Sequence, residues 1–202
     1  MTWEDPELRE SAVKFKIALV DTLVAWNRLE GTARYLTEIL AGANSRETQA
    51  LVAHIPNQTL ANTMQALSHG IDDETVDHVT HFCLGFSRLG AWRNYYIHGI
   101  QALAATDQEA VGFVNEVDTK SKKLTAHEAF ITTEQLATVR SRMEAFNSYA
   151  SAIIGHVYDH RGTHLYAYAP LSSLQKPDTP DQPNRDRLHL LSREPRPEPL
   201  PQ

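Results

Sequence analysis

The sequence lacks what several common classes of protein require. Its 202 residues include a single cysteine, Cys83, which excludes an internal disulfide and a cysteine-rich zinc site. No apolar run approaches the roughly 20 residues that span a bilayer, so no membrane segment is expected. The first six residues are acidic and lack the apolar stretch of a signal peptide. We therefore expect a cytoplasmic protein with no membrane partner.

Proline is scarce in most of the chain and concentrated at its end. Only Pro6 and Pro56 precede residue 170, whereas the other eight of the ten prolines lie from Pro170 onward. Few large apolar residues follow Leu174, and such a segment buries too little surface to offset its ordering entropy. The sequence predicts a helical domain over residues 1–169 and a disordered, proline-rich tail over residues 170–202. Removal of the residues after about Leu174 is expected to leave stability nearly unchanged.

Positive charge is also in short supply. The net charge is −6, and residues 176–202 carry five basic and five acidic side chains, so the imbalance lies in residues 1–175. Attraction to phosphates supplies most non-specific affinity for nucleic acids. An acidic body is therefore a poor general binder of RNA, and any RNA contact must be local.

Helical periodicity fills the part that lacks proline. A first helix is expected from about Ser11 to Gly42, with Glu30 on its apolar stripe, either exposed at the edge or paired with a buried arginine. Asn44 with Glu47 resembles a capping box that opens a second helix. That helix breaks at Pro56 and continues to Gly70.

The end of the domain contains a change of pattern followed by the clearest helix. Residues 111–131 indicate a short β-hairpin or an extended excursion. Its basic stretch over residues 118–123 is either a solvated turn or, as the alternative, a contact for phosphate. Thr132 and Gln135 form a second capping box, which opens a final helix. The apolar residues of that helix recur at alternating steps of three and four, as in a helical bundle: Leu136, Val139, Met143, Phe146, Ala150, Ile153 and Val157.

A third helix, opened by Asp72 as N-cap, contains the most unusual residues of the chain. Its apolar stripe consists of Val79, Phe82, Phe86 and Leu89. Arg93 takes the next position on that stripe, where burial costs several kcal/mol, roughly, unless the guanidinium is paired or faces a polar cavity. Asn94 and His98 are four residues apart and share a helix face. Gly99 is expected just beyond the helix end.

These residues, Arg93-Asn94-Tyr95-Tyr96-Ile97-His98-Gly99, resemble the motif of the HEPN superfamily. The order of the expected elements over residues 11–165 is also similar to the plan of that family. The resemblance implies an all-α fold: a four- to five-helix HEPN-like bundle with a short β-hairpin before the last helix and a disordered C-terminal tail. Many members of the family are homodimeric, metal-independent endoribonucleases.

The resemblance also implies roles for the motif residues. His98 would be the acid/base, Arg93 the phosphate clamp, and Asn94 would orient His98 or contact phosphate. Tyr95 and Tyr96 would contact the substrate. No metal and no cofactor are implied, and the partners would be RNA, a second copy and possible regulators such as a cognate antitoxin in a defence or toxin setting.

Two other interpretations stay open. Basic residues are favoured near helix C-termini by the helix dipole, so the motif can arise without catalysis. The chain would then be a non-catalytic dimerisation, scaffold or nucleotide-binding module, which its acidic body favours. A separate cluster, His156, His160 and His164, has helical spacing that can ligate a metal, but the same helix-end electrostatics account for it.

Overall fold

The computed structural model describes residues 5–42, 45–105, 109–118, 125–161 and 170–183. It confirms the predicted bundle of five helices with a small antiparallel sheet before the last helix. The helices are α1 (Pro6–Leu40), α2 (Arg46–Ala53), α3 (Asn57–Ser68), α4 (Asp73–Gly99) and α5 (Thr133–His160). The strands are β1 (Ile100–Ala105), β2 (Ala110–Asp118) and β3 (Thr125–Ile131), and a 3₁₀ turn, η1, covers Leu171–Ser173.

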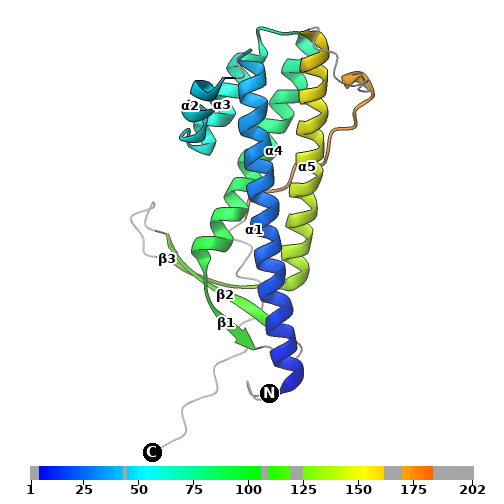
Figure 1. Ribbon diagram of the computed structural model, residues 1–202. Helices are drawn as coiled ribbons and strands as arrows, with labels where there is room; N and C mark the ends of the chain where they lie inside the picture. The colour runs from blue at the N-terminus through cyan, green and yellow to red at the C-terminus, as the bar shows by residue number, and fades with distance from the viewer. Residues whose placement is uncertain (1–4, 43–44, 106–108, 119–124, 162–169, 184–202) are drawn as a thin grey trace, which may run out of the picture.

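The three long helices α1, α4 and α5 lie side by side, and the sheet lies at one end of them (Figure 1). The short helices α2 and α3 flank the opposite end. The strands are ordered β1-β2-β3, each antiparallel to its neighbour. The sheet is joined to α1 by a hydrogen bond from the Ala110 backbone N–H to Ser11 Oγ at 2.9 Å. Phe15 packs against the backbone at Gly112.

The core is a stack of aromatic and aliphatic side chains between α1, α4 and α5. Trp26 of α1 stacks on Phe86 of α4 with ring centroids 5.2 Å apart. Every residue of the predicted α5 stripe is buried, as are the four apolar residues before Arg93. Cys83 is buried as well, and its thiol donates to the Ala61 carbonyl at 3.4 Å. Burial raises the pKa of this thiol to about 12.

Most predicted helix ends are confirmed. Asp72 caps α4, accepting a hydrogen bond from the Thr75 backbone N–H at 2.6 Å. Thr132 and Gln135 form the reciprocal capping box of α5. Gly42 adopts a φ of 71°, the left-handed conformation that glycine tolerates best, after the end of α1. Pro56 separates α2 from α3 as expected.

Three helix boundaries and one strand differ from the predictions. Helix α1 begins at Pro6, because Asp5 accepts a hydrogen bond from the Glu7 backbone N–H and acts as N-cap. The N-cap of α2 is Ser45, which accepts from the Thr48 N–H, so the predicted cap at Asn44 is wrong. Gly99 belongs to α4 and is not beyond its end. Strand β1 was not predicted at all.

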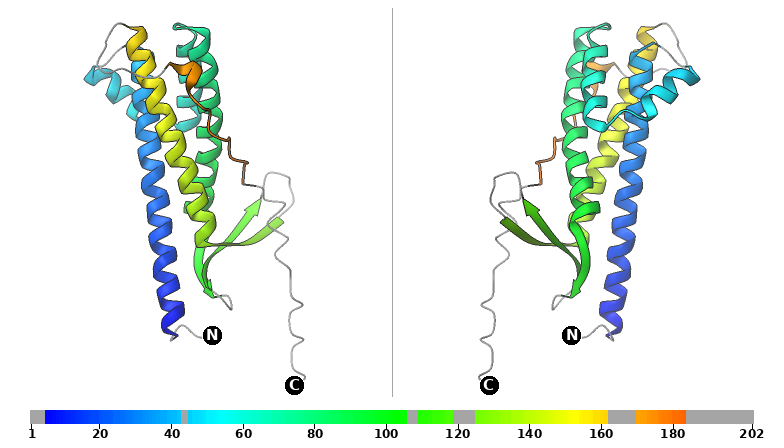
Figure 2. Two further views of the ribbon diagram at one scale, coloured as in Figure 1. Left: turned by 90° about the vertical axis from the view of Figure 1, so that its right-hand side faces the viewer. Right: turned by 90° about the vertical axis from the view of Figure 1, so that its left-hand side faces the viewer.

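The predicted tail begins too early. Residues 170–183 lie along α4 (Figure 2). Leu171 and Pro180 are buried, and Lys176 Nζ lies 2.6 Å from Asp77 Oδ2 of α4. The prediction that truncation after about Leu174 leaves stability nearly unchanged stays a prediction, and the binding of this backbone by side chains of α4 counts against it. The remainder of the predicted tail, residues 184–202, lies outside the described residues.

None of the helices in the described residues combines the length and apolar character needed to cross a bilayer.

We predict that substitution of Gly85 by alanine destabilises the fold strongly. A Cβ at Gly85 would lie 2.0 Å from Cε1 of Phe146, a ring that is fully buried and has no room to move. Overpacking of this kind typically costs about 1–3 kcal/mol. Gly31→Ala is the matched control: its Cβ meets nothing within 4 Å, and it should raise the free energy of unfolding by roughly 0.4–1 kcal/mol. Chemical denaturation measures both, and equal effects would contradict the packing described.

Candidate functional site

The motif residues lie at the last turns of α4, next to the sheet. The chain passes directly from Gly99 into β1, and a Cβ at Gly99 would lie 2.9 Å from Val114 of β2, so helix end and sheet are in close contact. Asn94, Ile97 and His98 are exposed and Arg93 is half-buried. Residues three and four apart on a helix are neighbours, so Ile97 adjoins both Arg93 and Asn94, and Asn94 adjoins His98. Arg93 and His98 themselves are about 140° apart around the axis, at the two edges of this surface. We name this surface the α4-end site.

Arg93 is only partly satisfied within the chain. Its Nη1 donates to Asn94 Oδ1 at 2.9 Å. Its Nε is buried and has no hydrogen-bond partner among the described residues. An unpaired donor out of contact with water costs free energy, typically about 1–3 kcal/mol. Arg93 is therefore half-buried at the end of the apolar stripe, as the sequence predicted, and is incompletely paired among the described residues.

His98 is exposed in the last turn of α4. No hydrogen bond joins its ring to any residue of the described chain, and in particular none joins it to Arg93 or Asn94. The structure therefore brings Arg93 and Asn94 into contact and leaves His98, one turn after Asn94, without a partner among the described residues that orients it. A single copy does not assemble a complete catalytic group from these three residues.

The predicted substrate role of Tyr95 and Tyr96 is not supported by their positions. Their exposed fractions are 8% and 1%, and both rings pack with Trp92 at centroid distances of 6.0 and 5.6 Å. The helical repeat explains this, because Tyr96 follows Phe86, Leu89 and Arg93 on the buried stripe. Burial, with a smaller contribution from Tyr95, raises the pKa of Tyr96 well above its ordinary value. The Tyr96 hydroxyl has no partner among the described residues.

Two histidines of α5 lie beside the acidic N-cap residue of α4. His156 Nε2 and His160 Nδ1 lie 3.5 and 3.7 Å from Asp72 Oδ2. Burial alone would raise the pKa of Asp72, but hydrogen bonds from Thr75 and the nearby imidazole of His156 outweigh it and lower the pKa. No group of three potential metal ligands occurs within the ranges that the structure describes. His164 lies outside them.

Sequence reasoning missed three side chains of α4 that bind the chain beyond α5. His81, Arg88 and Trp92 each contact a backbone carbonyl of residues 177–181. Their spacing of seven and four residues places them on one helix face, which is the signal that the sequence contained. Glu30 is half-buried and pairs at 2.6 Å with the half-buried Arg34 of its own helix, so it is neither exposed nor paired with a buried arginine.

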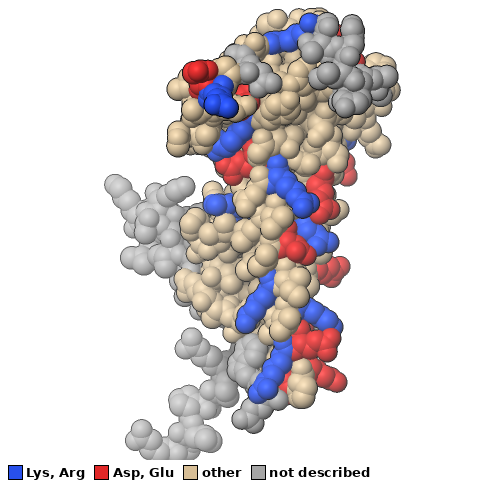
Figure 3. All heavy atoms as spheres, in the orientation of Figure 1, with Lys and Arg blue, Asp and Glu red and all other residues tan. Residues whose placement is uncertain are grey.

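The surface charge around α1 is mixed. In Figure 3, acidic and basic side chains alternate along α1, and this face shows no extended basic area among the described residues. This agrees with the net charge of −6. Non-specific attraction of a polyanion to this face is therefore weak.

Comparison of the chain with protein-family models, with curated proteins and with solved structures finds no match. The resemblance to the HEPN motif consequently depends on the residues of the α4-end site and on the order of the elements.

We predict opposite effects of removing two buried tyrosine hydroxyls. Tyr96→Phe should raise the free energy of unfolding by about 1 kcal/mol, because it removes a buried hydroxyl that lacks a partner in the described chain. Tyr149→Phe should lower it by a similar amount, because that hydroxyl lies 2.7 Å from His78 Nδ1. Thermal or urea denaturation measures both. Destabilisation by Tyr96→Phe would show that its hydroxyl has a partner, such as a second copy.

Proposed function

We propose that the α4-end site is a metal-independent endoribonuclease site of the HEPN type, completed by a second copy of the chain. The observation that carries the proposal is the half-buried Arg93, whose Nε lacks a partner among the described residues, in the same last turns of α4 as the exposed His98. A cation and an imidazole at one helix end are the two groups that this chemistry requires.

In the proposed reaction, the 2′-oxygen of a ribose attacks the adjacent phosphorus and the bond from phosphorus to the 5′-oxygen breaks. The products are a 2′,3′-cyclic phosphate and a free 5′-hydroxyl. One histidine accepts the proton of the 2′-hydroxyl, and a second acid donates a proton to the leaving 5′-oxygen. Arg93 stabilises the negative charge that develops on the phosphorane oxygens. Asn94 positions Arg93 through their hydrogen bond.

A second copy supplies what one copy lacks. Two α4 ends facing each other would provide two imidazoles, one for each proton transfer, and would cover the exposed Ile97. Contacts across such a cleft would also orient His98, which has no hydrogen-bond partner in the described chain. The acidic body then limits RNA binding to the cleft itself.

A non-catalytic scaffold is the second candidate function, and two observations favour it. The chain is acidic overall, and the two tyrosines of the motif are packed into the core, where no base can stack on them. In this alternative, the same helix end forms the interface between copies or with a regulator, and Arg93 pairs with an acidic group of the partner.

We predict a homodimer at micromolar concentration that depends on the α4-end site. Analytical ultracentrifugation should show a dimer for the wild-type chain. Ile97→Glu should shift the equilibrium toward monomer, because it places two carboxylates in an interface that otherwise buries an exposed apolar side chain. Leu84→Glu, at another exposed apolar position of α4, is the matched control and should leave the dimer intact. A wild-type monomer would contradict the shared cleft.

We predict that His98→Ala and Arg93→Ala each reduce RNA cleavage by about 10²–10⁴-fold while the chain stays folded and dimeric. His156→Ala is the matched control and should retain activity, because its imidazole contacts Asp72 at the far end of α4. Mixed cellular RNA incubated with EDTA, followed by analysis of the product termini, is the measurement. EDTA should have no effect, and products should end in 2′,3′-cyclic phosphate.

Two outcomes would redirect the assignment. Activity that survives His98→Ala but is lost with EDTA or with His156→Ala would indicate a metal-dependent site on α5. Absence of cleavage of any RNA by an intact wild-type dimer would favour the scaffold function.

A further inference from the structure

Residues 174–183, which we name the strap, follow η1 and run along α4 toward the sheet end of the bundle (Figure 2). Three side chains of α4 hold it through its backbone. His81 Nε2 lies 2.8 Å from the Pro177 carbonyl oxygen, Arg88 Nη1 donates to the Pro180 carbonyl at 3.1 Å, and Trp92 Nε1 donates to the Asp181 carbonyl at 2.7 Å. All three contacts bind main-chain acceptors, so they recognise the path of the chain more than its side chains.

The sequence of the strap fixes that path in advance. Prolines occur at every third position, 177, 180 and 183, and the residue before each of them is confined to extended conformations. Six of the eight residues from 176 to 183 are thus restricted before any contact forms. The residue at the start of the strap, Leu174, has a φ of −81° and a ψ of 116°. A triplet of prolines in extended backbone is the signature of a polyproline II segment, which loses little entropy on binding.

The repeats of strap and helix match in length. Seven residues of α-helix, from His81 to Arg88, rise about 10.5 Å and return to the same face. Three residues of polyproline II, from Pro177 to Pro180, advance about 9.3 Å. Two turns of α4 therefore match the spacing between successive prolines, so His81 faces the Pro177 carbonyl and Arg88 the Pro180 carbonyl. Trp92 is the third donor, one turn further along α4. The pairing of Lys176 Nζ with Asp77 Oδ2 at 2.6 Å fixes the direction of the strap.

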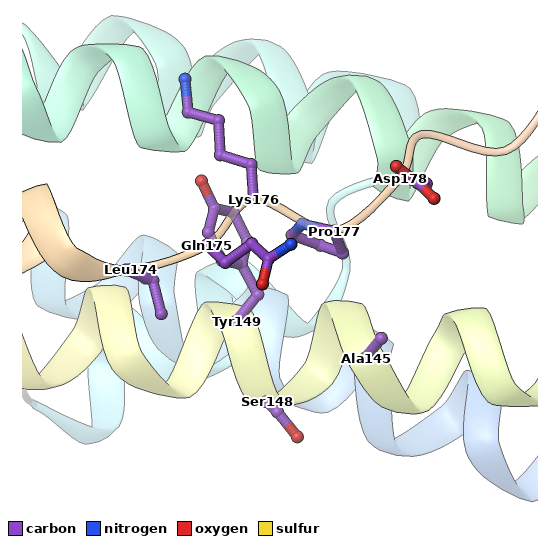
Figure 4. A pocket seen from close by; sticks show the side chains of 8 residues that line it. All are labelled: Ala145, Ser148, Tyr149, Leu174, Gln175, Lys176, Pro177 and Asp178. Atoms are coloured by element: carbon purple, nitrogen blue, oxygen red, sulfur yellow. The ribbon is translucent and has the colours of Figure 1, made fainter.

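The other wall of this groove is α5. Between α5 and the strap lies an open pocket of about 330 Å³, lined on the α5 side by Ala145, Ser148 and Tyr149 (Figure 4). Pro177 and Gln175 project into the space between the helices. The strap therefore contacts α4 directly, and an open space remains between it and α5. The groove between the two helices is wider than the strap that occupies it.

We propose that the groove between α4 and α5 is a binding site for proline-triplet peptides in the polyproline II conformation, and that the strap is its ligand in cis. His81, Arg88 and Trp92 are the recognition residues. A peptide of the strap's own sequence binds the groove whenever the attached strap is absent from it. The site is separate from the α4-end site and does not depend on the function proposed for that site.

The test uses the full-length chain with its strap weakened. Replacement of Pro177, Pro180 and Pro183 by glycine removes the conformational restriction and leaves the groove unchanged. A fluorescently labelled peptide of residues 170–183 should bind this variant in an anisotropy titration. It should bind the wild-type chain at least tenfold more weakly, because the attached strap competes at a high effective concentration. Arg88→Gln in the glycine variant should weaken peptide binding about 3–10-fold, as expected for one hydrogen bond.

Two controls test whether the groove recognises the sequence of the peptide and not merely its composition. Arg142→Gln changes an exposed arginine on α5 and should leave peptide binding unaltered. A peptide of the same composition in scrambled order should not bind. Equal binding of the native and scrambled peptides, or no binding of the native peptide to a folded glycine variant, would overturn the proposal.

A second measurement covers the case in which the glycine variant does not fold. In the otherwise wild-type chain, Arg88→Gln should speed cleavage at Asp178 by an aspartate-specific protease about 3–10-fold, because the strap leaves the groove more often. Arg142→Gln should be cleaved at the wild-type rate. Cleavage of the Arg88→Gln variant at the wild-type rate would also overturn the proposal.

Discussion

Ring packing along one face of α4 is the interaction on which the rest of the structure depends. Phe86 stacks on Trp26 of α1, and Phe82 and Phe86 lie 5.9 Å apart along α4. Gly85, with no side chain, leaves room for Phe146 of α5 at the same level of the bundle. These contacts bury large aromatic surfaces, each contributing several kcal/mol, roughly, to stability. They fix α4 between its neighbours, so an adjacent face of α4 holds the strap and its last turns form the α4-end site.

Two kinds of feature could be predicted from the sequence: those set by neighbouring residues, and those set by the helical repeat of apolar residues. The α5 stripe repeats without interruption over seven buried residues, and its capping box consists of Thr132 and Gln135, side chains three positions apart. The break at Pro56 and the left-handed Gly42 follow from the backbone limits of proline and glycine. Five helices and the hairpin before α5 followed from such signals.

The features that could not be predicted depend on distant partners. Strand β1 contains three alanines and a glutamine, which have no preference for strands, and its conformation is set by pairing with β2. The strap has too few apolar side chains to indicate packing, and its contacts use backbone carbonyls that composition does not reveal. Within the candidate site, the apolar stripe correctly indicated that Arg93 is partly buried. Tyr96 continues the same stripe, three residues after Arg93, so the helical repeat indicated that it is buried. The resemblance to the motif suggested a substrate contact in its place.

The buried thiol of Cys83 makes the chain well suited to site-directed labelling. Maleimides and nitroxide reagents react with thiolates, and a thiol inside the core with a pKa of about 12 supplies almost none near neutral pH. A cysteine introduced at an exposed position is therefore the sole reactive site among the described residues, with no need to replace the native one. Probes placed on α4 and on the strap would report the distance between these two segments.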